Sequence, residues 1–368
     1  MKKALKISAI VIGLLLLVII ALPFLFKGKI QKTVQSEINK NLNAVVTFDG
    51  VGLSLIRHFP DLTVKVKNLV VKGTGDFSAD TLASVPGLSL TLDLASVFGG
   101  SEYKVKQIDL KAPRFLFKVL KNGKVNWDVM KPSATADTVS TPSTFKVYLN
   151  KVSISDMRMV YDDAEIPTML ALDGLTGTMS GDMTADITSL DIKAVVKDIT
   201  ADYDGIRYMS KTTGEITTLL NANLSTWTFT FKDGNLRLND LNIKADGFFA
   251  MPDNGYNMDI KFAAKENTFK AFLSLIPAIY AKDFENVKTS GTMAFDGFVK
   301  GLYNDVSIPA FAVNLKVANG SFSYPGLPGN VSDVNLQAAI ANPDGVMDHT
   351  TVDVPRMHLS MMQNPVDI

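Results

Sequence analysis

The stretch APRFLFKVLKNGKVNWDVMKP, residues 112–132, holds the pattern that decides the fold. Phe115, Phe117 and Val119 occupy alternate positions, and Asn122-Gly123 follows them. Successive side chains of a strand point to opposite faces, so this alternation predicts a strand with one apolar face. An Asn-Gly pair favours a tight hairpin turn. The stretch therefore predicts a strand and a turn, closed by the sequence Gly-x-x-Asn-Trp-Asp at 123–128.

The same period of two recurs from Val45 onward. One early segment alternates Leu62, Val64 and Val66 with polar residues, and a leucine-rich one places Leu88, Leu90, Leu92 and Leu94 on one face. Later examples are FKVYL, VSISDMRMVY, TWTFTF, LRLNDLNIKA, MDIKFAA, TMAFDGFVK and FAVNLKVANGSFSY. One apolar and one polar face are typical of antiparallel sheet. The sequence thus predicts a mainly β protein.

Turn signals separate these segments at roughly the 8 to 12 residue spacing of an all-β fold. Each is an Asn or Asp followed by Gly, a pair that accommodates positive φ. They are Asn122-Gly123, Asp233-Gly234, Asp246-Gly247, Asn254-Gly255, Asn319-Gly320 and Asp344-Gly345. We expect a long meander of hairpins.

Three segments depart from this rhythm. Apolar residues four apart (Ile30, Val34, Ile38, Leu42) predict a short helix, and Ser, Thr, Pro and Ala make 131–144 a flexible loop or linker. Helical spacing of Phe269, Phe272, Leu273, Ile276 and Ile279 predicts a helix near 266–281, which Pro277 ends or kinks. The last residues stop inside a strand-like pattern, which leaves two interpretations: the chain is truncated at residue 368, or it is complete there.

The N-terminus predicts a membrane span. Lys2, Lys3 and Lys6 precede an uncharged apolar run at 7–26, long enough to cross a hydrocarbon core of roughly 30 Å. A cleaved signal peptide is the alternative, but the run is long and no A-x-A pattern follows it. We therefore favour an uncleaved anchor with its N-terminus in the cytoplasm.

Composition argues against several classes of function. The 368 residues carry 37 basic and 37 acidic side chains, so the chain lacks the excess of basic residues expected of a protein that binds nucleic acid. The chain has no cysteine and three histidines, without metal-ligand spacing or a Ser-His-Asp signature. GTGDFS at 73–78 and ADYDGI at 201–206 lack the remaining parts of a phosphate loop and a calcium loop. We expect no enzyme, no cofactor and no metal site.

The apolar face of such a meander must be covered. The sheet either folds on itself as a sandwich or barrel with an ordinary core, or curves and leaves an open apolar trough that would suit acyl chains. The alternation pattern alone favours the ordinary core, and the apolar trough remains the alternative.

The order of several motifs resembles the AsmA family. These are the span, HFPDLTVKVKNLVV with Pro60 and Leu62, Leu82-Ala83 before the leucine-rich segment, 108–113, and Gly123 to Asp128. The segments FLSLIPAIYAKDFENVKTSGTMAFDGFVKG and VANGSFSYPGLPGNVSDVNLQAAIANPDG resemble large AsmA-like proteins. The resemblance extends over most of residues 1–361.

The resemblance implies a protein anchored in the bacterial inner membrane, with most of the chain periplasmic. Its implied fold is a transmembrane helix followed by a long curved antiparallel sheet, a β-groove with a few short helices. Its implied function is to bind phospholipid and assist lipid transport to the outer membrane; the alternative is a non-enzymatic scaffold or assembly factor for outer-membrane proteins.

The implied organisation is an anchor at 1–26, an AsmA-like N-terminal region at 27–130, the linker at 131–144 and a β-groove region at 145–368. Phospholipids, the inner membrane through 7–26, and outer-membrane or other envelope proteins are the expected partners. Asn126, Trp127 and Asp128 are expected to be structural. Alternation nominates as groove-lining residues Leu88, Leu90, Leu92, Leu94, Phe115, Phe117 and Val119.

Overall fold

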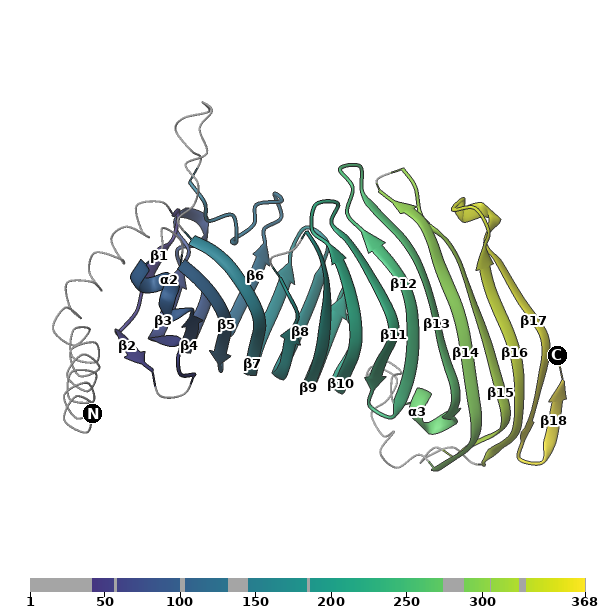
Figure 1. Ribbon diagram of the computed structural model, residues 1–368. Coiled ribbons are helices and arrows are strands. Elements are labelled where there is room, and N and C mark those ends of the chain that lie inside the picture. Colours follow the sequence, from purple (N-terminus) through teal and green to yellow (C-terminus); the bar gives the residue numbers. More distant parts are fainter. Residues whose placement is uncertain are drawn as a thin grey trace, which may run out of the picture. The chain divides into compact units, whose positions relative to one another are not determined.

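The computed structural model describes residues 42–55, 58–99, 103–131, 145–183, 186–273, 288–304, 306–323 and 329–367. The chain divides into two compact units, Met1–Tyr148 and Leu149–Ile368. Both are built mainly of β-strands, with a few short helices, and each is described below by itself (Figure 1). The mainly β class predicted by the alternation is confirmed.

The first unit is a small antiparallel sheet. β3 pairs with β1, β2 and β4, and β4 pairs with both β5 and β6. The strands are β1 (Val45–Thr47), β2 (Gly50–Ser54), β3 (Leu62–Lys72), β4 (Thr81–Leu92), β5 (Tyr103–Lys111) and β6 (Arg114–Val119). Two short helices join them, η1 (Gly75–Phe77) and α2 (Leu94–Gly99).

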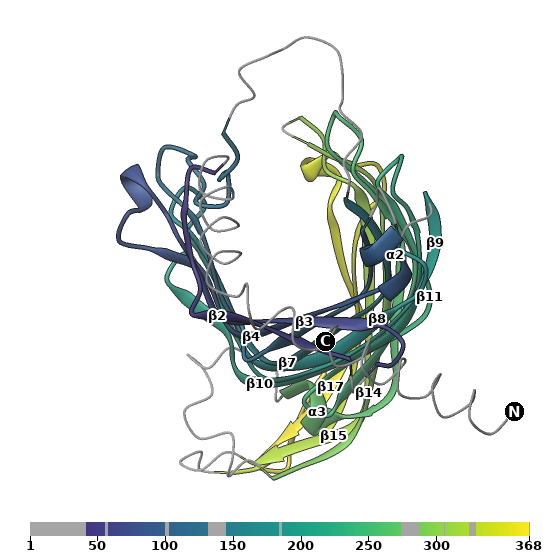
Figure 2. The same ribbon diagram turned by 60° about the vertical axis from the view of Figure 1, so that its left-hand side comes forward.

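The second unit is a meander in which each strand pairs antiparallel with the next. The strands bow along their length (Figures 1 and 2). They are β7 (Phe145–Asp163), β8 (Thr168–Ser180), β9 (Ile187–Tyr203), β10 (Ile206–Asn223), β11 (Thr228–Leu238), β12 (Leu241–Ala250), β13 (Tyr256–Thr268), β14 (Lys288–Tyr303), β15 (Ala310–Ser323), β16 (Val331–Asn342), β17 (Thr351–Met361) and β18 (Asn364–Asp367). The described strands thus form one consecutive layer.

Three of the six predicted turns are wrong. Asp233-Gly234, Asp246-Gly247 and Asn319-Gly320 lie inside β11, β12 and β15. Asp233 and Asn319 have positive φ, and the register shifts at both places, as it does at a β-bulge. An Asx-Gly pair supplies positive φ to a bulge as readily as to a turn. The strands that contain these three pairs are 11, 10 and 14 residues long.

The helices α3 and η3, which lie in the described part of the second unit, are short. α3 comprises Phe269–Leu273, because β13 continues through Thr268, whose hydroxyl accepts the Ala271 N–H at 3.1 Å. The predicted helix near 266–281 therefore begins later than expected, and its remainder at 274–281 lies outside the described residues. The other helix is η3 (Met347–His349).

The predicted N-terminal helix and linker lie outside the described residues, apart from Leu42 and Lys131 at their borders. The described ranges hold no helix long and apolar enough to span a membrane.

Candidate functional site: the apolar face of the second unit

One face of the second sheet carries a row of apolar residues that crosses six strands. Residues directly opposite each other in antiparallel strands share a face. The registers of β7 to β12 place opposite one another, in order, Ile154, Gly177, Ala194, Ile216, Leu236 and Ile243. We call this the central row, and the face that carries it the apolar face.

A second apolar row runs parallel to the first on the same face. Its members on β9 to β15 are Leu190, Leu220, Phe231, Gly247, Ile260, Val299 and Phe311. Neighbouring strands lie about 4.8 Å apart, so seven strands give this row a length of roughly 29 Å. The two rows make the apolar face continuous across the strands.

The opposite face is polar, and its charged side chains pair across strands. Arg237 contacts Glu215, and Lys300 contacts Asp259 at 2.8 Å. Asn314 donates to Asp296 at 3.0 Å. Each strand therefore has one side suited to water and one suited to apolar contact.

Among the described helices of this unit, α3 packs on the apolar face and covers part of it. Ala271 packs with Leu241 and Ala264, and Phe269 packs with Met293. The three strand residues Ala264, Met293 and Leu241 are 0%, 1% and 2% exposed. A covering helix thus buries this face completely where it lies.

Away from α3, parts of the same face are exposed to solvent. Ile216 and Ile340 are each 38% exposed, and Val352, which lies opposite Ile340, is 72% exposed. Most other members of the two rows are half-buried. The expectation that the sheet closes on itself as a sandwich does not hold for the described part of this unit, because no second sheet lies over these rows.

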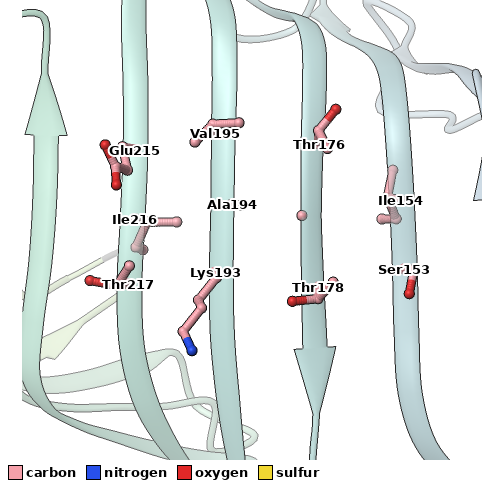
Figure 3. Close-up of a pocket in the computed structure, with 11 residues that line it drawn as sticks. Ser153, Ile154, Thr176, Thr178, Lys193, Ala194, Val195, Glu215, Ile216 and Thr217 are labelled. Carbon is pink, nitrogen blue, oxygen red and sulfur yellow. The ribbon is translucent and has the colours of Figure 1, made fainter.

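A shallow hollow of about 380 Å³ lies over β7 to β10, and Figure 3 shows its lining. Its walls are alternate residues on the polar side of these strands: Ser153, Thr176, Thr178, Lys193, Val195, Glu215 and Thr217. The central-row residues Ile154, Gly177, Ala194 and Ile216 also line it. Consecutive residues of all four strands, from both alternation sets, therefore line this hollow.

The groove residues proposed from the sequence lie in the first unit. Leu88, Leu90 and Leu92 lie opposite Val66, Val64 and Leu62 of β3 and therefore share one face. Leu88 and Leu90 are half-buried, whereas Leu92 is only 8% exposed and belongs to the core.

Leu94 does not continue that row. It begins α2, because the Asp93 carboxylate accepts the Ser96 N–H at 2.9 Å and so starts a helix where the pattern predicted more strand. Lys106 binds Asp93 at 2.9 Å and Asp61 at 2.8 Å. The hydrogen bond from Lys106, followed by that from the Ser96 N–H, lowers the pKa of Asp93.

The opening stretch forms a small aromatic cluster. The rings of Phe115 and Phe117 are stacked with centroids 6.1 Å apart, and Trp127 meets Phe117 edge-on at 5.9 Å. Val119 is buried at 6% exposure, so it is a core residue and not an open lining. The first unit therefore brings Phe115 and Phe117 together with Trp127, a contact that the sequence did not specify.

Asn126 explains the Gly-x-x-Asn-Trp-Asp ending. Its side chain is 3% exposed, donates to the Leu116 carbonyl at 2.7 Å and accepts the Lys118 N–H at 2.9 Å. The backbone N–H of Asn126 also donates to the Lys118 carbonyl at 3.0 Å. Asn126 thus bonds the chain after the Asn122-Gly123 turn back onto β6.

Two titratable groups at the end of β7 are engaged in structural contacts. The Tyr161 hydroxyl donates to Asp163 at 2.7 Å, which raises the pKa of Tyr161 to about 12. Asp163 also accepts the N–H groups of Glu165 and Ile166, and these bonds with Tyr161 lower its pKa. In the described ranges no three His, Asp or Glu residues are grouped to hold a metal ion.

Comparison with known proteins gives one match. The family model described as AsmA family matches residues 1–272, which is most of the chain. The chain therefore belongs to the AsmA family, as its motifs suggested. No curated protein and no solved structure matches it.

Proposed function

We propose that this protein binds the acyl chains of phospholipids along the apolar face and assists their transport between the inner and outer membranes. The observation that carries the proposal is the continuous pair of apolar rows, most of whose members away from α3 are at least partly exposed to solvent. Large open apolar surfaces mark binding sites. Membership of the AsmA family and the large β-sheet fit an envelope role.

The shape of the surface suits a long unbranched ligand. An extended acyl chain laid across the strands would contact one residue of each strand in turn, as the second row provides from Leu190 to Phe311. Side chains on the apolar face offer it no charge along either row. A phosphate headgroup would remain in water beyond the rows, because burying an unpaired charge is costly.

The proposal requires no catalysis. Movement of a lipid along an apolar surface breaks no covalent bond, and the hydrophobic contribution is roughly proportional to the apolar area covered, whichever part of the face is occupied. We propose the inner membrane as the location, with residues 7–26 as the anchor and the remaining chain in the periplasm.

The alternative function, a scaffold for outer-membrane proteins, requires a closed apolar face and a free strand edge. The open face of the second unit favours the lipid carrier. Outer-membrane and other envelope proteins remain proposed partners in either case.

The test uses photo-reactive residues in the full-length chain in its own cells. Ile216 lies on the apolar face and Thr217, the next residue of β10, lies on the polar face. We expect mass spectrometry to find phospholipid cross-linked at position 216 and not at 217. Equal lipid at both positions, or none at 216, would overturn the proposal.

A matched pair of substitutions checks the same face. Leu220→Asp places a carboxylate in the second row, whereas Leu219→Asp places it on the opposite face at a side chain that is 58% exposed. We expect Leu220→Asp to remove most of the lipid cross-linked at 216 and Leu219→Asp to leave it unchanged. Equal losses of cross-linked lipid in the two variants would show that the loss does not depend on the apolar face.

A further inference from the structure

The turns at one end of the second sheet form a continuous edge. The hairpins that join β8 to β9, β10 to β11, β12 to β13, β14 to β15 and β16 to β17 all lie at the upper ends of the strands in Figure 1. We call these turns, with the strand residues that flank them, the rim.

Neighbouring turns of the rim contact each other directly. The Leu224 N–H donates to the Asp186 carbonyl at 2.7 Å, and the Met251 N–H donates to the Trp227 carbonyl at 3.1 Å. The Asn304 side chain donates to the Asn254 carbonyl at 3.1 Å. A Cβ added to Gly345 would collide with the Ile308 carbonyl, so the last two turns also lie against each other. The rim is therefore an ordered surface.

Large apolar side chains project from every turn of the rim. Val306 is 89% exposed, Ile187 71%, Met347 65% and Trp227 55%. Others exposed there are Leu224, Met251, Tyr256, Tyr303 and Val346. Aromatic residues and methionine are enriched in protein–protein interfaces, and a contiguous exposed set of this kind marks one.

The rim is also acidic. The turn sequences GDMTAD, LSTW, MPDNG, NDVSIP and PDGVMDHT contain no lysine or arginine. Their described acidic residues are Asp182, Asp186, Asp253, Asp344 and Asp348. Among these, Asp344 pairs with His349 at 2.7 Å, which lowers the pKa of Asp344 and keeps it ionised.

The exposed apolar side chains and the aspartates together indicate which kind of partner the rim can bind. A bilayer with anionic lipids would be repelled by the carboxylates, and so would a second copy of the same rim, because like charges placed opposite each other are unfavourable. We propose that the rim binds a basic amphipathic segment of a partner protein. Its apolar side chains would cover those of the rim, and its lysine or arginine residues would pair with the aspartates.

The test places a photo-reactive residue at Val306 or Met347 in the full-length chain in its own cells. Mass spectrometry then identifies the molecule and the peptide cross-linked at each position. The proposal expects a peptide of another protein that carries basic and apolar residues. Cross-linked lipid, a second copy, a segment of this chain, a peptide without basic residues, or no product would each overturn it.

Charge reversal provides the control. Asp253→Lys with Asp348→Lys should lower the yield of that product roughly tenfold or more, since like-charge contacts in an interface cost several kcal/mol. Asp240→Lys, in an exposed turn at the other end of the strands, should leave the yield unchanged. A photo-reactive residue at Ile166, 58% exposed at that other end, should not give the product. An unchanged yield after the double reversal would overturn the proposal.

Discussion

The ring of Phe262 lies against Gly297, the residue directly opposite it on β14. A Cβ added to Gly297 would come within 2.7 Å of Cζ of Phe262 and would also collide with the Ala312 carbonyl. The glycine thus lets the aromatic ring lie close to the backbone of β14 on the apolar face. This close approach requires a residue without a side chain.

Gly297→Ala should therefore destabilise the protein by overpacking, by about 1–3 kcal/mol. Urea unfolding of the full-length chain in detergent, followed by the fluorescence of its tryptophans, measures the change. Gly52→Ala is the matched control, because a Cβ on that strand glycine would be 4.0 Å from the nearest atom, Cβ of Lys65. A stability equal to the parent protein would contradict the packing described for Phe262.

Ala271 lies in the contact between α3 and the sheet at 1% exposure. Ala271→Asp would bury an unpaired carboxylate among Leu241 and Ala264, at a cost of several kcal/mol, so α3 should leave the sheet. Hydrogen exchange should increase in α3 and in the part of β14 around Met293. Lys270→Asp, at an exposed neighbouring position, should not produce this change. Unaltered exchange around Met293 in the first variant would contradict the covering role of α3.

Asn126 satisfies two backbone groups of β6 through its amide. Asn126→Ala would leave the Lys118 N–H and the Leu116 carbonyl without these bonds, and we expect a loss of roughly 2–4 kcal/mol. Asn122→Ala removes one exposed turn contact with the Lys124 N–H and should cost less than about 1 kcal/mol. Equal losses in thermal or urea unfolding would contradict a structural role for Asn126.

Much of the fold could be predicted from local sequence, because strand alternation and turn chemistry are local properties. The bulges could not, since Asp233-Gly234 has the same chemistry in a turn and inside β11. The bulge also shifts the alternation by one residue, so that Phe231 and Leu236, five residues apart, share the apolar face. Counting in twos along the sequence would place these two residues on opposite faces.

The candidate site was harder to predict for a related reason. Apolar alternation identified Phe115 and Phe117 in one short stretch, but the two long rows depend on the register of distant strands, such as Ile260 opposite Val299. Register between strands is not visible in one strand alone. The alternation within segments such as TWTFTF, LRLNDLNIKA, MDIKFAA and FAVNLKVANGSFSY supplied a local signal, and it was used to predict the fold and not the site.

The contact of Asp93 with Lys106 predicts how stability depends on pH. The pKa of Asp93 lies below its ordinary value of 3.8 in the folded protein, chiefly because Lys106 donates a hydrogen bond to it. A lowered carboxyl pKa contributes stability that is fully present above pH 3.8 and is lost as the pH falls through the folded pKa. Asp93→Asn removes this contribution. The difference in unfolding free energy between parent and variant should therefore be constant from about pH 5 to pH 8 and shrink below about pH 4. Urea unfolding across this range measures it, and a difference that grew on acidification would show that Asp93 is not stabilised as its carboxylate.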